Sequence, residues 1–351
     1  MGDLPTFTAE QLTRVGLAAF EAAGTPLDEA KHTVELLVKS DLCGHESHGT
    51  MRIPSYIEKI LNGTCKPGSS IKIVRDFGAT ALVDGGWGLG QVVATRTMKL
   101  AIEKADRYGV SAVETSNCCH IGRMADYALM ATHHDMIGVC AVNAVAAVAP
   151  YGGVERIFNQ SPIGIAIPAG EEPTYVLDIS TSVCAGGKIM HALAKGEKLP
   201  EGYITDKDGN PTTDPEDFVK GGACLPFGGP VAYKGYGLAM AVDVIAGILS
   251  GRGPAFDKAG KEQGIFQMAI KIDAFQPVQE FKTNIDRLIR TVRESRKAPG
   301  FKEILIPGEP ELISKKEKAR TGIDVPQKTW DRILQTAKKV NINIEELLEK
   351  S

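Results

Sequence analysis

No stretch of the 351-residue sequence holds the roughly eighteen consecutive apolar residues that a membrane-spanning helix requires. Residues 1–6 lack the basic segment followed by an apolar run that marks an export signal. From these two absences we expect a cytoplasmic protein that has no membrane partner.

Basic residues are neither in excess nor clustered. Lys and Arg number 40 against 43 Asp and Glu, which gives a formal net charge of −3. Binding to a phosphate backbone requires a basic stripe or patch on one face of the protein. We therefore expect no nucleic-acid partner.

Paired cysteines and metal-ligand spacings are also missing. The seven cysteines are an odd number with no repeated spacing, which argues against a disulfide framework and favours reduced thiols. Adjacent Cys118 and Cys119 rarely point at one ion, and the spacing of His45 and His48 offers no third ligand. We predict no metal site.

The dinucleotide fingerprint G-x-G-x-x-G is absent. Residues 85–90 read Gly-Gly-Trp-Gly-Leu-Gly, which is not the fingerprint spacing, and no acidic residue sits suitably near the end of a following strand to bind a ribose. This glycine-rich segment is typical of a tight turn with close backbone packing. The sequence therefore predicts neither a Rossmann fold nor a Walker loop.

The pattern that is present indicates a globular α/β protein. Hydrophobic residues make up 43% of the chain and charged residues 24%, both ordinary values for a folded domain. Thr8 can cap a first helix through Gln11. Periodicity predicts helices over residues 8–20, 26–38, 56–61, 91–107, 124–132, 188–193, 276–297, 330–340 and 344–348, the last two on the surface. Short apolar runs predict strands over 71–74, 81–83, 110–113, 137–142, 163–167, 176–179, 265–272 and 304–307. Strands that alternate with helices are typical of an α/β core.

Two further segments have a distinct composition. Residues 196–230 are rich in Gly, Pro and Asp, and residues 206–211 predict a turn within an excursion from the core. Residues 237–249 are apolar on almost every helical face, so we expect a helix that is buried on all sides. Domain boundaries are blurred. We divide the chain into a helical part at 1–75, a central α/β region that binds cofactor and substrate at 76–290, and a part at 291–351 that packs back on the first.

The densest polar cluster is Ser47-His48-Gly49, followed by Arg52 and Tyr56. A helix that restarts near Ser47 would place His48 and Arg52 on one face, with Tyr56 one turn further. Arginine can grip a carboxylate through two hydrogen bonds while a histidine exchanges a proton with a neighbouring oxygen. These side chains suit a 2-hydroxy or 2-oxo acid. The alternative is an ordinary helix start, with Ser47 as the cap and the other side chains in solvent.

Two polar loops follow predicted strands, where ligands gather in open α/β sheets. His120 follows the strand at 110–113 and is a second acid/base candidate, or a side chain that ties loop backbone together. Asp178 and residues 179–182 (Ile-Ser-Thr-Ser) follow another strand; Asp178 could fix a histidine tautomer, and the loop could hold a phosphate or act as an ordinary helix cap. Lys234 with Gly235, at the start of an apolar helix, could neutralise a cofactor phosphate.

These blocks together resemble the type-2 malate/L-lactate dehydrogenase family, also called sulfolactate dehydrogenase-like. The resemblance spans nearly the whole chain and rests on eight motifs in order, which are Ser47-His48-Gly49 with Arg52 and Tyr56, Asp84-Gly85 with Gly90-Gln91, His120-Ile121-Gly122-Arg123, Ala149-Pro150-Tyr151-Gly152-Gly153, Leu177-Asp178 with Thr181-Ser182, Thr213-Asp214-Pro215, Lys234-Gly235-Tyr236-Gly237-Leu238 and Pro307-Gly308-Glu309.

The resemblance implies an NAD- or NADP-dependent oxidoreductase with a non-Rossmann fold: a mixed-sheet cofactor domain and a helical domain built from both termini. It also implies a homodimer. Reactions in this family transfer a hydride to or from C2 of malate, lactate or related acids, aromatic acids among them; the same site serves cyclic imine reduction in some members. A noncatalytic NAD(P)-binding dimer is the more remote alternative.

Roles follow on matching positions. The resemblance makes His48 the acid/base group, supported by Ser47 and Asp178, with Arg52 on the substrate carboxylate and Tyr56 lining the site. His120 would line the pocket or be the acid/base group itself. The cofactor residues would be Ile179, Ser180, Thr181, Ser182, Lys234, Gly235, Pro307, Gly308 and Glu309.

The chain departs from the family pattern at two places. Residues 159–162 read Asn-Gln-Ser-Pro where the family usually has Gly-Thr-Asn-Pro, and Ala144 replaces the polar residue that several relatives carry after the preceding Asn. We expect both changes to reshape loops beside the cofactor, so the preference between NAD and NADP stays open.

Overall fold

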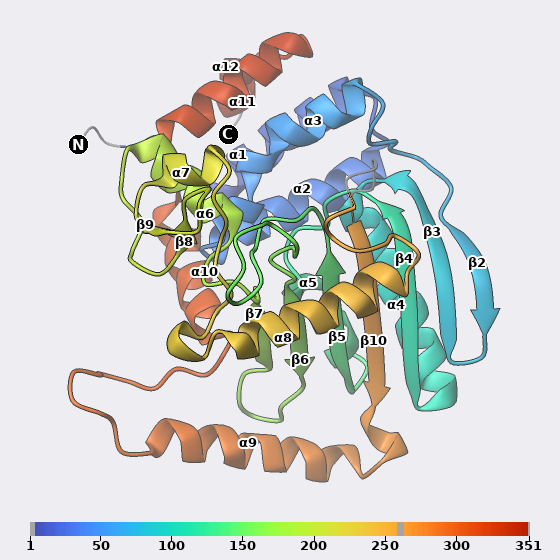
Figure 1. Ribbon diagram of the computed structural model, residues 1–351. Coiled ribbons are helices and arrows are strands. Elements are labelled where there is room, and N and C mark those ends of the chain that lie inside the picture. Colours follow the sequence, from blue (N-terminus) through green and yellow to red (C-terminus); the bar gives the residue numbers. More distant parts are fainter. Residues whose placement is uncertain (1–3, 258–262, 350–351) are drawn as a thin grey trace.

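The computed structural model describes residues 4–257 and 263–349 and is built around one seven-stranded sheet (Figure 1). The strand order is β2-β3-β4-β10-β5-β6-β7. The strands are β2 (Lys72–Phe77), β3 (Thr80–Gly88), β4 (Val110–Cys118), β5 (Met136–Asn143), β6 (Ile163–Ile167), β7 (Tyr175–Ile179) and β10 (Gln263–Lys271). Only β3 and β4 run parallel; the other neighbours are antiparallel. The sheet is therefore mixed, as the family resemblance predicts, and unlike a Rossmann sheet.

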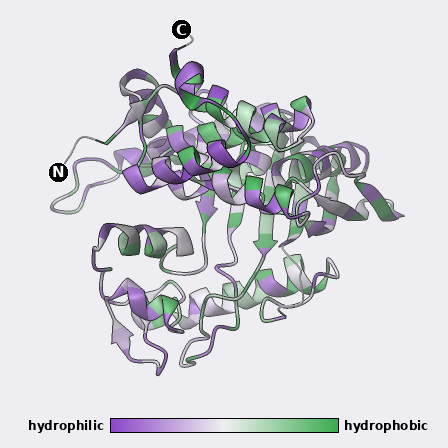
Figure 2. Ribbon diagram, turned by 90° about the horizontal axis from the view of Figure 1, so that it is seen from above, coloured by the Kyte–Doolittle hydropathy of each residue, from purple (hydrophilic) through white to green (hydrophobic). Residues whose placement is uncertain are grey.

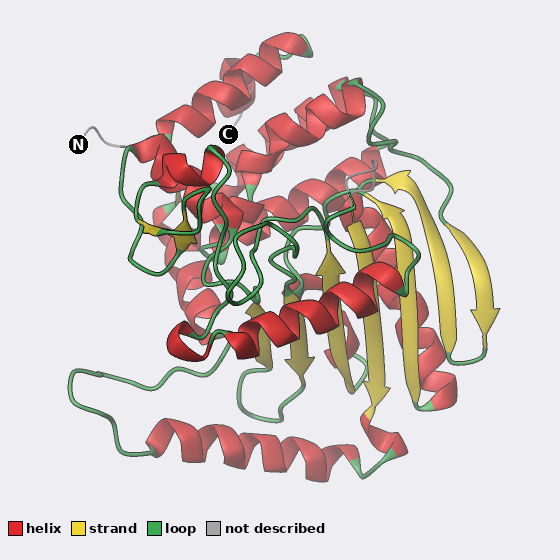
Figure 3. Cartoon of the chain, in the orientation of Figure 1, coloured by secondary structure: helices red, strands yellow, loops and turns green. Residues whose placement is uncertain are grey.

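Helices cover both faces of this sheet (Figure 3). The helices α4 (Gly90–Tyr108) and α5 (Ala125–Thr132) pack on one face, around a core that includes Val83, Val113 and Tyr127. On the other face lies α8 (Tyr233–Val242), which continues as a π-helix over Asp243–Ile248. Parallel and antiparallel strands thus share one covered layer, whose edge carries the loops described below.

The helix at 233–248 is buried on its sheet side only, so the prediction of burial on all sides is wrong. Val242 and Ala246 pack against Ala141 of β5. The opposite face carries Met240 and Leu249, which are 50% and 63% exposed. An apolar composition is the same for a helix that the rest of the chain surrounds and for a helix that exposes one apolar face, so composition alone could not separate the two.

Helices from the two ends of the chain form a second layer with its own core. It contains α1 (Ala9–Ala22), α2 (Leu27–Leu42), α3 (Ile53–Leu61), α11 (Gln327–Lys339) and α12 (Ile344–Glu349), with β1 (Thr6–Phe7) paired to β11 (Ile323–Asp324). Thr8 and Gln11 form a capping box at the start of α1, as the sequence predicts. The rings of Phe7 and Trp330 lie 4.2 Å apart between centroids, so the α11 helix is anchored in this core rather than lying free on the surface.

A third, smaller lobe is formed by residues that follow β7 in the chain. It holds α6 (Gly186–Lys195), the hairpin of β8 (Ile204–Thr205) and β9 (Pro211–Thr212), and α7 (Pro215–Val219). Its core includes Phe158, Ile189 and Ile204. Asp206 accepts hydrogen bonds from the amides of Asp208 and Asn210, which forms the predicted turn.

The remaining helices are α9 (Val278–Glu294) and α10 (Glu309–Thr321). Outer helices alternate polar and apolar colours along their length, as amphipathic helices do (Figure 2). The sequence pattern did not predict α10, and the strand predicted at 304–307 does not form: these described residues are coil that leads into a turn. The domain limits proposed from the sequence at 75 and 290 fall inside β2 and α9.

Candidate active site

A cavity of about 610 Å³ lies where the terminal helices, the sheet and the small lobe meet. β4, β5 and β7 all end at this edge, and β10 begins there, because β4, β5 and β7 run in one direction. The cavity is lined by side chains from three distant segments, among them His48, Arg52, His120, Arg123, Asp178 and Ser180. The structure therefore brings together the three polar clusters that the sequence presents separately.

His48 and Arg52 lie in two short 3-10 turns rather than on one α-helix. The turns are η1 (Glu46–His48) and η2 (Thr50–Arg52), and they are separated by Gly49; the α-helix itself begins only at Ile53. A Cβ on Gly49 would lie 1.7 Å from Oδ1 of buried Asp41, so only glycine fits there. Asp41 Oδ2 accepts hydrogen bonds from the Thr50 amide at 2.8 Å and its hydroxyl at 2.7 Å.

The same turns are attached to α10 from outside. The His45 ring lies 2.9 Å from the Glu311 carboxylate, and Lys318 pairs with Glu46 at 2.5 Å. Lys318 also donates to the Asp41 carbonyl at 3.0 Å. His45 and Glu311 are 266 residues apart in the sequence, so distant segments of the chain fix these turns together.

In His48 and Arg52, one side-chain nitrogen is held by a hydrogen bond to Ser47, and the other nitrogens are left for the cavity. Ser47 Oγ lies 2.9 Å from Nδ1 of His48, which leaves Nε2 for a ligand. Arg52 donates through Nε to the Ser47 carbonyl at 2.6 Å. Among the described residues this is the one hydrogen bond of the Arg52 side chain, so its terminal nitrogens are available to an anion.

His120 is held in the same way by Tyr56. The Tyr56 hydroxyl lies 2.6 Å from Nδ1 of His120 and accepts a hydrogen bond from the Gln91 amide at 3.1 Å. The rings of His48 and His120 are stacked, with centroids 5.4 Å apart and planes 27° apart. The two imidazoles therefore form one pair at the floor of the cavity.

Both histidines are neutral at neutral pH. Burial and then the positive charge of Arg52 lower the pKa of His48 to about 3. The same two causes, followed by His48 itself, hold the pKa of His120 well below its ordinary value. A neutral imidazole beside a guanidinium can accept a proton.

Asp178 lines the cavity but does not bond to a histidine in the described structure. Its Oδ2 accepts the backbone amide of Ala125, at the start of α5, at 2.9 Å. Burial raises the pKa of Asp178, against the opposing effects of the Ala125 amide and the Arg123 charge. The prediction that Asp178 fixes a histidine tautomer therefore finds no contact here.

The loop after β7 has the features of a phosphate cradle. Ser180 faces the cavity, whereas Thr181 is buried and donates to the Gln160 carbonyl at 3.0 Å. The α6 helix begins at this loop without a side-chain cap, and its first residues, Gly186 and Gly187, also line the cavity. Uncapped amides at a helix start attract anions.

The other cofactor residues predicted from the sequence lie away from this cavity. Lys234 is exposed on α8, and Gly235 packs against the Phe227 backbone. Pro307 accepts a hydrogen bond from Val176 of β7 at 3.0 Å, so residues 307–309 run beside the edge strand, where Gly308 has a φ of 99°. Glu309 pairs with Arg293 at 2.5 Å.

Comparison with known proteins decides the family. A sequence model of the family "Malate/L-lactate dehydrogenase" matches residues 7–334. The chain belongs to this family.

Relatives in this family resemble the protein over almost its full length. The L-sulfolactate dehydrogenase of Methanocaldococcus jannaschii is 40% identical over 332 residues, 93% of this chain and 94% of the relative. The malate dehydrogenase of Pyrococcus horikoshii is 39% identical over 328 residues, 91% of each. The solved malate dehydrogenase structure from Entamoeba histolytica superposes with a TM-score of 0.92 at 28% identity, over 97% of this chain and 99% of that one. The resemblance and the fold class inferred from the sequence are confirmed.

The two places where this chain departs from the family pattern both lie in the cavity wall. Ala144 and the segment 159–162, where this chain departs from the family pattern, contribute Ala144, Asn159, Gln160 and Pro162 to the lining. Among the described residues no helix is long and apolar enough to span a membrane, and no group of three candidate ligands could hold a metal.

Three residues at or beside the cavity were not predicted from the sequence as site residues. Lys188, which follows two glycines at the start of α6, lines the cavity. Arg123 also lines it and belongs to the motif His120-Ile121-Gly122-Arg123, but no role was assigned to it. Asp41 looked like any acidic residue of an amphipathic helix. Only its burial beside Gly49 reveals it.

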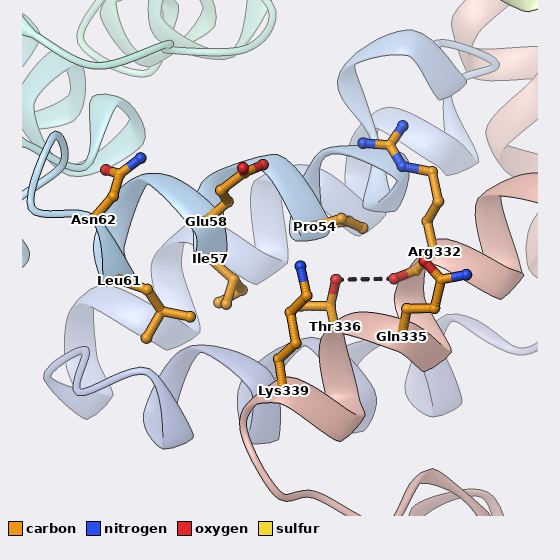
Figure 4. A pocket seen from close by; sticks show the side chains of 9 residues that line it. All are labelled: Pro54, Ile57, Glu58, Leu61, Asn62, Arg332, Gln335, Thr336 and Lys339. Atoms are coloured by element: carbon orange, nitrogen blue, oxygen red, sulfur yellow. Dashed lines mark hydrogen bonds between the residues drawn. The ribbon is translucent and has the colours of Figure 1, made fainter.

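A second hollow, of about 350 Å³, lies between α3 and α11 (Figure 4). Its charged residues are Glu58, Arg332 and Lys339. No histidine lines it, and it lacks the paired imidazoles and helix start of the larger cavity. We place the chemistry in the larger one.

Proposed function

We propose that this protein interconverts a small 2-hydroxy acid and the corresponding 2-oxo acid with NAD or NADP, at the cavity that holds His48 and Arg52. One observation carries this proposal. The neutral imidazole of His48 lies beside the guanidinium of Arg52, whose terminal nitrogens have no hydrogen-bond partner among the described residues, on two adjacent 3-10 turns. Such a pair can hold a carboxylate and move the proton of the neighbouring oxygen at the same time.

Arg52 is positioned to hold the carboxylate. Its Nε is anchored to the Ser47 carbonyl, so the terminal nitrogens are oriented before a ligand arrives. Carboxylates bind guanidinium groups through two parallel hydrogen bonds, which also fixes the orientation of C2. The rest of the acid then lies toward the two imidazoles.

His48 is the group that exchanges the proton. Ser47 occupies its Nδ1, so Nε2 faces the substrate oxygen. Because the Arg52 charge is one cause of the low pKa of His48, a bound carboxylate that neutralises this charge raises that pKa. Substrate binding itself therefore makes His48 a better proton acceptor.

His120 polarises the same oxygen. The Tyr56 hydroxyl accepts a hydrogen bond from Gln91 and donates its own proton to Nδ1 of His120 at 2.6 Å, which is nearer than the alternative acceptor, the His120 carbonyl at 3.3 Å. The Nε2 of His120 then carries a hydrogen that points into the cavity. Charge that develops on the substrate oxygen is stabilised by this fixed donor.

The cofactor residues fit a nicotinamide dinucleotide. The bound dinucleotide supplies or accepts the hydride at C2. The uncapped start of α6, with Ser180 and Lys188 beside it, can hold a phosphate near the imidazole pair. Residues 179–182, Lys234 with Gly235, and 307–309 are proposed to hold the rest of the molecule.

Two further proposals concern the state of the protein. The exposed apolar face of α8 and its π-helical continuation, with Met240, Val244 and Ile248, supports a homodimer. Seven free thiols suit the reducing cytoplasm.

A substrate panel tests the proposed function. Pyruvate, oxaloacetate, an aromatic 2-oxo acid and a cyclic imino acid are each mixed with NADH or NADPH, and absorbance at 340 nm is followed. Turnover of 2-oxo acids supports the proposal; turnover of the cyclic imine alone would make the protein an imine reductase. Tight NAD(P)H binding with no turnover of any member would indicate a noncatalytic protein.

A further inference from the structure

Arg123 is a second arginine in the active-site cavity. It follows β4 and the left-handed Gly122, which has a φ of 83°, and it lines the same cavity as Arg52 and His48. The residue is only 6% exposed. A cation is thus held almost out of solvent at the wall of the substrate site.

This guanidinium has unsatisfied donors. Its Nε and Nη1 are buried and have no hydrogen-bond partner among the described residues. Buried arginines are nearly always paired, because an unpaired buried charge costs several kcal/mol of solvation. A buried donor without a partner, on the wall of a cavity, points to a ligand that completes it.

Nearby acids do not fill this role. Asp126 pairs with Lys39 at 2.8 Å, and Asp178 accepts the Ala125 amide. Within the described chain no ion pair joins either carboxylate to Arg123. Burial lowers the pKa of Arg123, but the charges of Asp126 and Asp178 and a hydrogen bond to the Cys43 thiol more than offset it, so the pKa is raised and the group stays charged. The Cys43 contact leaves Nε and Nη1 without a partner.

Four cations line this cavity. Lys188 and Arg332 are exposed, the proposed function uses Arg52 and Lys188, and Arg123 is the buried cation that it leaves unused. We propose that Arg123 binds a second anionic group, a carboxylate or a sulfonate on the far side of C2, so that the preferred substrates are dianionic 2-oxo acids. This inference rests on the proposed function. It makes Arg123 a specificity-determining residue, since it does not take part in the chemistry at C2.

Charge matching supports this choice. With both histidines neutral, a monoanion would satisfy Arg52 and leave the donors of Arg123 buried and unpaired. A dianion satisfies both. A site built to bond a ligand group discriminates strongly against analogues that lack the group, for the same reason.

The test compares Arg123→Gln and Arg123→Lys with wild type on three substrates: pyruvate, oxaloacetate and 3-sulfopyruvate. We expect Arg123→Gln to lower kcat/KM for both dianions by about 10- to 100-fold, mainly through KM, and to change that for pyruvate less than about threefold. Arg123→Lys restores the charge and should recover part of the loss. The matched control is Arg107→Gln, an exposed arginine near the far end of α4, about 25 Å along the helix from the cavity end.

Other outcomes overturn the inference. An equal fall of kcat/KM on all three substrates would indicate that Arg123 acts through the Asp178 carboxylate and does not bind a second anionic group. Weakened NADH or NADPH binding in Arg123→Gln, measured by fluorescence titration, would assign Arg123 to the cofactor. Equal wild-type efficiency on pyruvate and the dianions would also contradict it.

A binding measurement separates this inference from the proposed function. L-Malate and L-lactate are compared for their effect on Tm without cofactor. If no substrate is turned over, the proposed function fails, and Arg123 is still tested: L-malate should raise Tm in wild type but not in Arg123→Gln. An equal shift in both proteins would contradict the second anion site.

Discussion

Replacement of Asp41 by Asn should make the protein less sensitive to alkaline pH. Burial, which outweighs the hydrogen bonds from Thr50, raises the pKa of Asp41 to about 7 from an ordinary value of 3.8. Between these two values the folded state keeps a proton that the unfolded state has released. Stability is therefore lost as pH rises through this range, until the carboxyl group is ionised in both states.

The size of the effect follows from the width of that window. Between pH 5 and pH 8, about two pH units lie below the folded-state pKa of Asp41, where the carboxyl group is protonated in the folded state only. Each of these units lowers the unfolding free energy by about 1.4 kcal/mol. Wild type should therefore lose about 2 to 3 kcal/mol of unfolding free energy that Asp41→Asn does not lose. Asparagine still offers an oxygen to Thr50, so the turn that carries His48 is retained.

The assay is urea unfolding of both proteins at pH 5 and pH 8. Other titrating groups are shared by the two proteins, so they cancel in the comparison. Asp273→Asn, at an exposed aspartate, is the control and should follow wild type. Identical pH profiles for wild type and Asp41→Asn would refute the account of the buried carboxyl group.

Three further substitutions test the catalytic turn. His48→Ala should lower kcat by about 10²- to 10⁴-fold and leave NAD(P)H binding unchanged in a titration; near-normal turnover would transfer the proton to His120. Arg52→Met should mainly raise KM for the acid, by about 100-fold, and an unchanged KM would contradict the clamp. Gly187→Ala would place a Cβ 2.7 Å from the Cβ of Ser47, so kcat should fall although no catalytic atom is removed; unchanged kinetics would show that the turn is not set by α6.

Most of the fold was predictable because periodicity reports local structure. The alternation of strands and helices, the Thr8 cap and the turn at 206–211 depend on neighbouring residues, and the structure confirms them. The mixed sheet was expected only from the family resemblance. The strand order and the single parallel pair were not predicted, since they depend on long-range pairing. The helix α10 was missed because its weakly apolar sequence is held by contacts to α2, and no periodic stripe marks it.

The candidate site was predictable in its parts but not in its contacts. Sequence motifs named His48, Arg52, His120 and Asp178, and the structure places all four around one cavity. The Tyr56–His120 contact spans 64 residues, and the missing Asp178–histidine contact depends on where α5 starts. No local pattern encodes either, because both depend on how the sheet edge meets the terminal helices.

The most direct test of the central claim follows the hydrogen atom. NADH or NADPH carrying deuterium at both hydrogen positions of C4 is incubated with the protein and its best 2-oxo acid from the panel. The account predicts one deuterium at C2 of the hydroxy acid product, detected by mass spectrometry and proton NMR. A hydroxy acid without deuterium, or deuterium at another carbon, would contradict hydride transfer at C2.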